Sequence, residues 1–285
     1  MSMPFFPPGG DPGSSFPELL RRIGVDAGGV LDGRGLMASS SGPSSPDGHG
    51  FTVPPPSQGH SFVVPHATTC LAARYADGVV MAGDRRATSG NLISHRAMDK
   101  VLPAARHSGV AIAGAAGPAM EMVKLFQLQL EHYEKVEGLP LSLDGKANQL
   151  SMMVRGNLPA AMQGLVVVPI FAGYDTLRGM GRLFTYDVTG GRYEESDYAA
   201  TGSGSLHAGT VVKVGFRPNL SRDEAVDLCL RALWEAADAD SATGGPDPLR
   251  NIFPAVATIT DSGFERVTDE ELRRRFEAIA QAAQS

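Results

Sequence analysis

The amino-acid sequence predicts an α+β fold, in which helices cover antiparallel sheets. Short apolar runs rich in β-branched residues are joined by tight turns, as in hairpins. The amphipathic helices come in separate blocks instead of alternating one by one with strands, which argues against a parallel sheet. A sharp change of composition after residue 67 separates a first segment from a single domain over 68–285.

The strands are expected as pairs along the domain. Residues 69–75 and 78–83 flank Ala-Asp-Gly, and 101–105 and 110–115 flank His-Ser-Gly, both good hairpin turns. Further runs of the same kind predict strands at 166–174, 182–187, 198–202, 256–260 and 264–267.

Four helices follow from apolar residues that recur at steps of three and four. The first spans about 119–137 and ends at Gly138, and the second runs over 144–162. Ser221 to Glu224 form a capping box that opens the third helix. Thr268 caps the fourth, giving the order strands, two helices, strands, helix, strands, helix.

Residues 1–67 have the composition of a segment without a packed core. They hold 11 of the 20 prolines, 12 of the 34 glycines and no lysine, so they bury too little apolar surface to offset the entropy of ordering. On composition alone a disordered tail is the ordinary interpretation. A propeptide is the sharper one, and it depends on the residues that follow.

Charge and cysteine content restrict the function classes. The net charge of −6 predicts no nucleic-acid or anionic-membrane partner. No apolar run approaches the ~18 residues of a membrane span, and the start lacks the pattern of a secretory signal. Two cysteines in apolar stretches fit a reducing cytoplasm. No metal or other cofactor is expected.

The junction between the two segments places Thr68 at the start of the first strand. A threonine hydroxyl is a weak nucleophile that needs a base. If Thr68 became the first residue, its own α-amine, with a pKa of about 7.7–8.0, would be that base. The ordinary interpretation of Thr68-Thr69 is β-propensity alone.

Thr68 is followed by Asp84 and Lys100 at the ends of two strands, and by the turn Gly114-Ala115-Ala116-Gly117. With later stretches such as 153–158 and 241–247, these residues resemble the proteasome β-subunit family, and most of all its actinobacterial members. The resemblance covers nearly all of 68–285. It implies the four-layer αββα sandwich of N-terminal nucleophile hydrolases, with 1–67 as propeptide and 68–285 as catalytic domain.

The resemblance also implies roles for individual residues. Thr68 would be the nucleophile, and Lys100, held by Asp84, would favour its deprotonated hydroxyl. The Gly114 N–H would donate to the oxyanion. Accessory residues that orient the threonine amine and hydroxyl would be Ser203, Asp240 and Thr243, where the family often has serine at the last position. Otherwise Lys100 is a solvated strand-end lysine, and Asp84 a turn acid paired with Arg85 or Arg86.

Substrate contacts carry over in the same way. Thr88 matches a position whose backbone pairs with an extended substrate. Five apolar residues match the pocket for the residue before the scissile bond and imply a chymotrypsin-like preference: Ala87, Met98, Ile112, Ala116 and Met120. Without the resemblance these side chains would simply be core.

The expected cleavage site, between Ala67 and Thr68, departs from the family. Glycine usually precedes the catalytic threonine, because self-cleavage needs a tight turn that alanine adopts less readily. The departure bears on the efficiency of maturation and leaves the nucleophile unchanged.

The resemblance implies a cytoplasmic threonine endopeptidase that degrades unfolded proteins in seven-membered β rings. These rings would be stacked with rings of a separate α subunit, and an ATPase ring would deliver tagged substrates. One alternative is the related two-ring bacterial peptidase, which has Gly-Asp-Gly-Gln where this chain has Gly-Asp-Arg-Arg. Another is a non-catalytic ring subunit, which would be expected to lack Thr68, Asp84 or Lys100.

Overall fold

The computed structural model describes residues 68–89 and 91–284. The expected propeptide, 1–67, lies outside the described residues, and Ala67 with it. One five-stranded antiparallel sheet contains the strand that follows Thr68. Its strand order is β10 (Tyr198–Gly202), β1 (Thr69–Tyr75), β2 (Gly78–Gly83), β11 (Ala255–Thr260) and β12 (Gly263–Arg266).

A second five-stranded sheet is also antiparallel throughout. Its strands follow one another as in the sequence: β5 (Val101–Ala105), β6 (Ser108–Gly114), β7 (Val167–Asp175), β8 (Met180–Tyr186) and β9 (Arg192–Glu195). A short hairpin of β3 (Ala87–Ser89) and β4 (Leu92–His95) stands apart from both sheets.

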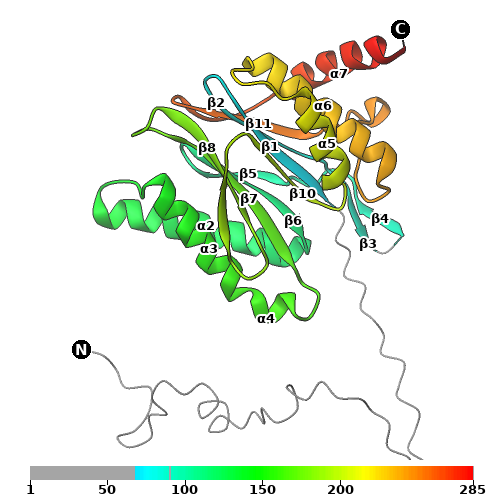
Figure 1. The fold of residues 1–285 in the computed structure, drawn as a ribbon. Coiled ribbons are helices and arrows are strands. Elements are labelled where there is room, and N and C mark those ends of the chain that lie inside the picture. Colours follow the sequence, from blue (N-terminus) through cyan, green and yellow to red (C-terminus); the bar gives the residue numbers. More distant parts are fainter. Residues whose placement is uncertain (1–67, 90, 285) are drawn as a thin grey trace, which may run out of the picture. The chain divides into compact units, whose positions relative to one another are not determined.

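The two sheets lie face to face between two layers of helices (Figure 1). The second sheet is covered by α2 (Ala116–Glu137) and α3 (Leu143–Gly156), which α4 (Leu158–Ala161) follows. The first sheet is covered by α5 (Ser205–Gly215), α6 (Arg222–Ala239) and α7 (Asp269–Gln284). A short 3₁₀ helix, η2 (Pro248–Arg250), precedes β11. The predicted α+β class and the four-layer αββα sandwich are confirmed.

Buried apolar residues fill each interface between layers. The cluster between the sheets includes Cys70, Val79, Ile170 and Leu183, all fully buried. Beneath α6 and α7 a second cluster contains Cys229, and a third, around Phe126, joins α2 and α3 to their sheet. Strands buried on both faces explain why β1 and β2 are almost continuously apolar.

Capping residues begin or end three of the helices where the sequence predicts it. Gly138 ends α2 with a left-handed φ of 72°, which a residue without Cβ adopts at no steric cost. Ser221 and Glu224 make both hydrogen bonds of the capping box that begins α6. The N–H of Glu271 donates to the Thr268 hydroxyl at the start of α7 (3.3 Å).

Two expectations about helices need correction, and three short strands, β3, β4 and β9, are not predicted from the sequence. The helix predicted over 144–162 is interrupted at Asn157, and α4 begins with Pro159 in its first turn, where a missing N–H does no harm. A helix not predicted at all, α5, occupies Ser205–Gly215. Its glycine and β-branched residues are poor helix formers, so its packing through Ala208 and Val212 stabilises it instead.

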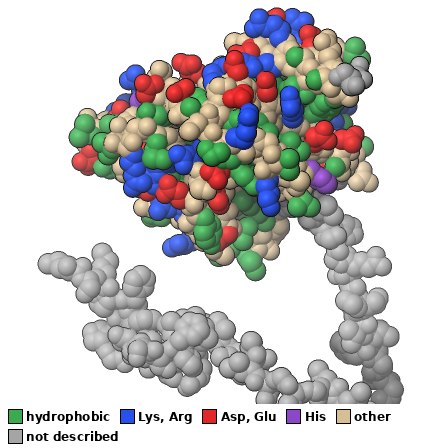
Figure 2. All heavy atoms as spheres, turned by 45° about the horizontal axis from the view of Figure 1, so that its top comes forward, with side chains coloured by type: hydrophobic (Ala, Val, Ile, Leu, Met, Phe, Trp, Pro, Cys, Tyr) green, Lys and Arg blue, Asp and Glu red, His purple; other side chains and the backbone are tan. Residues whose placement is uncertain are grey.

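The visible face in Figure 2 carries acidic and basic side chains interspersed, without an extended patch of one sign. Among the described residues, no helix combines the length and apolar character that crossing a bilayer would need.

Candidate active site

Thr68 lies directly before β1, a strand flanked by β10 and β2 inside its sheet. The residue is only 5% exposed, and its carbonyl accepts a hydrogen bond from the Ser203 N–H (2.9 Å). Thr68 also belongs to the wall of a cavity of about 310 Å³. The predicted nucleophile is therefore fixed in position and faces a space that a substrate side chain can enter.

Asp84 and Lys100 form a buried ion pair. The Lys100 Nζ lies 2.6 Å from the Asp84 Oδ1, and the two side chains are 1% and 0% exposed. Lys100 also donates to the Arg86 carbonyl (2.5 Å). The alternative of a solvated lysine is therefore wrong, and Arg85 pairs with Asp99 instead of Asp84.

The Asp84 carboxylate joins three separate segments of the chain. Its Oδ1 accepts from the Thr69 N–H (2.8 Å) as well as from Lys100. Its Oδ2 accepts from the N–H groups of Arg86 and Gly244, both at 2.8 Å. Four donors satisfy this buried carboxylate, which removes much of the cost of keeping it away from water.

Ser203, Asp240 and Thr243 form a second polar group. The hydroxyls of Ser203 and Thr243 both donate to the Asp240 Oδ2, at 2.5 and 2.6 Å, and the Ala242 N–H donates to Oδ1. Burial acts to raise the pKa of Asp240, but these hydrogen bonds outweigh it and hold the pKa below its usual value. Asp240 is therefore ionised at neutral pH, and the Thr243 hydroxyl is one of its donors.

Gly114 ends β6 in the wall of the same cavity as Thr68. Its φ is +116°, and a Cβ added there would lie 2.0 Å from the Val166 carbonyl oxygen. Only glycine fits this backbone position. The fold thus requires glycine at the predicted oxyanion donor whether or not it has that role.

The cavity brings together five of the six predicted substrate contacts. Its wall contains Ala87, Thr88, Met98, Ile112 and Ala116. Met120 is absent from the wall and packs, partly buried, against the cluster around Phe126. Sequence reasoning did not assign the other wall residues to the site: Ser89, Ser94, Ala115, Gly117, Pro118, Ala119 and Leu165. Among the described residues that line this cavity, none has a charged side chain.

β3, which carries Ala87 and Thr88, has one edge without a strand partner. Among the described residues it pairs only with β4, and the register shifts between Ala87 and Thr88. An unpaired edge presents main-chain N–H and C=O groups to which an extended peptide can add. The role of Thr88 in pairing with a substrate stays a prediction.

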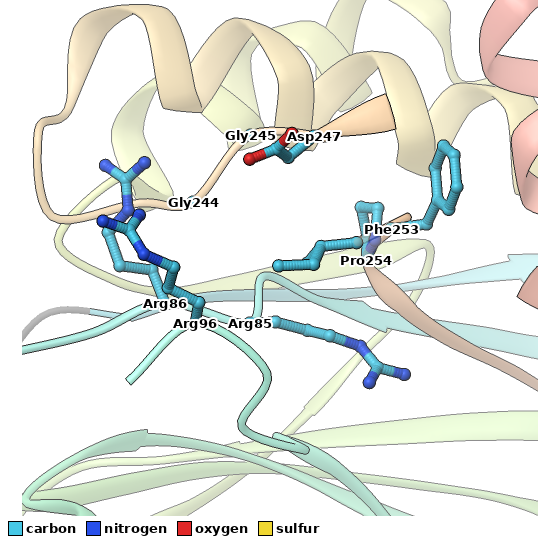
Figure 3. Close-up of a pocket in the computed structure, with 9 residues that line it drawn as sticks. Arg85, Arg86, Arg96, Gly244, Gly245, Asp247, Phe253 and Pro254 are labelled. Atoms are coloured by element: carbon cyan, nitrogen blue, oxygen red, sulfur yellow. The ribbon is translucent and has the colours of Figure 1, made fainter. Parts of the chain in front are cut away.

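A smaller pocket lies beside the Asp84 network (Figure 3). Its volume is about 40 Å³, and its lining includes Arg86 and Gly244, whose N–H groups donate to Asp84. The guanidinium of Arg85 points away from those of Arg86 and Arg96 (Figure 3). Because the three charges do not converge, we assign no ligand to this pocket.

Sequence reasoning also missed Thr69, whose main chain and side chain both contact the site. Next to a proposed nucleophile, a hydroxyl side chain at the start of an apolar strand is the signal that could have found it.

Comparison with known proteins identifies the family. The model of the proteasome subunit family matches residues 64–247. A proteasome subunit beta of Acidimicrobium ferrooxidans is 52% identical over 282 residues, covering 99% of this chain and 94% of the relative. That of Streptomyces griseus is 61% identical over 217 residues, covering 76% and 77%, and that of Jonesia denitrificans 54% over 218, covering 76% and 72%. The chain therefore belongs to the proteasome family, as a bacterial β subunit.

Proposed function

We propose that this subunit is an active threonine endopeptidase, with Thr68 as its nucleophile once residues 1–67 have been removed. One observation carries the proposal: Thr68 and Gly114 share the wall of one cavity, and the main chain next to Thr68 is hydrogen-bonded to the buried Asp84–Lys100 pair. A non-catalytic ring subunit would have no evident need for a fully buried lysine there.

In the proposed reaction the Thr68 Oγ attacks the carbonyl carbon of the scissile bond while the α-amine takes up the hydroxyl proton. The Lys100 ammonium favours the developing alkoxide, and the Gly114 N–H donates to the oxyanion. The tetrahedral intermediate collapses to an ester on Thr68, and the leaving amine takes the proton. Water then hydrolyses the ester, with the same amine as base. Ser203, Asp240 and Thr243 would orient that amine.

We propose that removal of residues 1–67 is autocatalytic, with the Thr68 hydroxyl attacking the Ala67 carbonyl. The composition break at residue 67 supports this boundary, as does a family match that begins only four residues before Thr68. The same oxygen and the same Gly114 donor would then serve maturation and turnover.

The cavity wall supports a preference for large apolar residues before the scissile bond. Ala87, Met98, Ile112, Ala116 and Leu165 offer apolar surface, and a charged substrate side chain would find no ionic partner among the wall residues. A missing partner costs ~1–3 kcal/mol, or roughly ten- to a hundred-fold in kcat/KM. Fluorogenic peptides that differ only at this residue measure the preference, and faster cleavage after acidic or basic residues would contradict it.

The proposed assembly consists of homo-heptameric β rings stacked with α-subunit rings, supplied with tagged proteins by an ATPase ring. We place it in the cytoplasm, where the buried thiols of Cys70 and Cys229 stay reduced. Native mass spectrometry after co-expression with an α subunit tests the ring composition.

The central experiment compares Thr68→Ala with Thr68→Ser in the full chain, co-expressed with an α subunit. Thr68→Ala should enter rings, keep residues 1–67 and cut no peptide, because the attacking oxygen is gone. Thr68→Ser should keep part of both activities, reduced because serine lacks the methyl that restricts the rotamer. Intact mass and peptide hydrolysis are measured together. Peptide hydrolysis by pure Thr68→Ala rings would show that Thr68 is not the nucleophile, and its maturation alone would show that cleavage is not autocatalytic.

A further inference from the structure

Thr69 is fully buried, yet its hydroxyl makes two polar contacts. The Gly204 N–H donates to the Thr69 Oγ1 (2.9 Å), and the Thr69 Oγ1 lies 2.6 Å from the Thr243 Oγ1. A hydroxyl this deep in a sheet is stable only when hydrogen-bonded, and both contacts lead into the group around Asp240.

The protons in this chain of hydrogen bonds have one consistent direction. Thr243 donates its single hydroxyl proton to the Asp240 Oδ2 (2.6 Å). The Thr69 hydroxyl must therefore donate to the Thr243 Oγ1 while it accepts from Gly204. The bonds run from the Gly204 amide through two threonine hydroxyls to a carboxylate, and each strengthens the next by polarising it.

The backbone is shaped around the Thr69 hydroxyl. A Cβ at Gly204 would lie 2.4 Å from the Thr69 Oγ1 and 2.7 Å from the Thr243 Oγ1. Any other residue would push the two hydroxyls away from the start of α5. The absence of a side chain at Gly204 lets its N–H reach Thr69.

The main chain of Thr69 connects these side-chain hydrogen bonds to the Asp84–Lys100 pair. Its N–H donates to the Asp84 Oδ1, which also binds Lys100, and its carbonyl accepts from the Asp84 N–H (3.0 Å). The preceding carbonyl, that of Thr68, accepts from the Ser203 N–H. Thr69 is thus bonded to the Asp84–Lys100 pair by its backbone and to Thr243 and Gly204 by its side chain.

We infer that Thr69 is a positioning residue for the peptidase. Its hydroxyl fixes the positions of Thr243 and of the turn at residues 203–204 relative to Thr68. The inference rests on the proposed function, in which Thr68 is the nucleophile. Without the hydroxyl, the buried Gly204 N–H loses its acceptor and Thr243 loses a donor, so the turn shifts relative to Thr68.

The test compares Thr69→Val, which keeps the shape and removes the hydroxyl, with Thr69→Ser, which keeps the hydroxyl. Both are made in the full chain co-expressed with an α subunit, and rates are expressed per mature amino terminus from intact mass. For Thr69→Val we expect kcat to fall on the order of 10- to 100-fold, the usual effect of a misplaced catalytic group, with little change in KM. Thr69→Ser should recover most of the loss.

The pH profile of kcat/KM separates positioning from plain destabilisation. In the proposed function Asp240 orients the Thr68 amine, and with the Thr69 donor gone Thr243 donates more weakly to Asp240, so the Asp240 charge is less neutralised. That charge favours the protonated form of the amine and so raises its pKa. The acid limb of the kcat/KM profile should therefore move to higher pH in Thr69→Val. Thr258→Val is the matched control, since it removes a buried hydroxyl from β11 of the same sheet and should change neither kcat nor the limb.

Each outcome decides the matter. Wild-type kcat and pH profile in Thr69→Val would overturn the inference, as would equal losses in Thr69→Val and Thr69→Ser. If Thr69→Val forms no rings, Thr69→Cys, a weaker donor of similar shape to serine, must fall below Thr69→Ser in kcat, and equality would overturn it. If Thr68→Ala rings hydrolyse peptides, the proposed function fails first, whatever the Thr69 variants do.

Discussion

Two buried cations, Lys100 and Arg182, are held in opposite ways. Lys100 pairs, among the described residues, with the carboxylate of Asp84, itself fully buried. Arg182 is 3% exposed and has three carboxylate partners at 2.7–2.9 Å, Asp144, Asp175 and Glu194. Two of these three reach water, with Asp144 43% and Glu194 46% exposed. Lys100 is therefore buried together with its partner, whereas Arg182 connects the interior to carboxylates at the surface.

The difference reflects what each cation binds together. Arg182 uses all three of its nitrogens and clamps the start of α3 to β7 and β9, elements that contribute no expected site residue. Lys100 is a compact charge that donates to Asp84 and to a main-chain carbonyl next to the cavity wall. The comparison teaches that burial of a charge alone does not mark a catalytic site. The elements that its partners come from distinguish the two cases.

The largest expected effect is that of Lys100→Met, which keeps the length of the side chain and removes the charge. Peptidase kcat should fall on the order of 10³-fold or more, because the alkoxide of Thr68 loses its cation. The Asp84 carboxylate is left without its counter-ion, so the free energy of unfolding should also drop, by about 3–5 kcal/mol. Peptide hydrolysis by assembled rings and urea unfolding of the subunit measure the two effects, and a kcat within tenfold of wild type would contradict the first.

Arg182→Met should mainly lower the free energy of unfolding and leave kcat almost unchanged. The clamp between α3 and the sheet is lost, and we expect the free energy of unfolding to fall by about 3 kcal/mol. The kcat per mature subunit should stay within about twofold, since no site residue lies on these elements. A loss of kcat as large as in Lys100→Met would remove the distinction drawn here.

A third expected effect is that acid lowers the free energy of unfolding through the cluster of Arg182 with its partners Asp144, Asp175 and Glu194. Hydrogen bonds from Arg182 hold the pKa of Asp144 and of Glu194 below their usual values. Burial acts to raise the pKa of Asp175, but a further hydrogen bond from Arg182 and two from main-chain N–H groups outweigh it and lower that pKa. Groups with lowered pKa stabilise the fold above their unfolded pKa of about 4, and this contribution is lost as the pH falls through the folded values.

The free energy of unfolding of wild type should therefore fall steeply below about pH 4, and less steeply in Arg182→Met, which lacks the clamp. Urea midpoints at pH 7, 5, 4 and 3 give the two curves. Parallel curves would show that the clamp does not contribute to acid sensitivity.

The smallest effect is expected for Arg85→Ala. Arg85 contacts Asp99 at 3.4 Å, and both side chains are partly exposed. Removing this pair should change the free energy of unfolding by no more than about 1 kcal/mol and kcat by less than about twofold. Thermal unfolding and peptide hydrolysis check both values, and a large loss of kcat would place Arg85 inside the site.

The sequence reveals those parts of the molecule that depend on side-chain identity. The hairpins, the end of α2 at Gly138 and the capping box of α6 follow from residue types and spacing. Asp84, Lys100 and Gly114 are identified through the resemblance to a family; the structure pairs Asp84 with Lys100 and places Gly114 in the same cavity wall as Thr68. The roles assigned to them remain proposals that the variants above test.

Features that depend on the backbone were not predictable. The acceptor of Lys100 is the carbonyl of Arg86, and two donors to Asp84 are amides of Arg86 and Gly244. Every residue except proline has such groups, so nothing in a sequence marks the ones that will be used. The hydroxyl chain from Thr69 to Asp240 joins residues far apart in sequence, and only the packing of β1 against the start of α5 creates it.

The two cysteines offer a way to time the opening of separate layers. Burial raises the pKa of the Cys70 thiol to about 12 and raises that of Cys229 as well, so neither thiol reacts while its surroundings are closed. Cys70 lies between the sheets, whereas Cys229 lies on the buried face of α6, in the cluster between the helices and the first sheet. Alkylation of each thiol by iodoacetamide, followed by mass spectrometry, would therefore report how often its layer opens under native conditions. The alkylation rate of Cys70 thus reports opening of the interface between the sheets, and that of Cys229 reports opening of the helices that cover the first sheet.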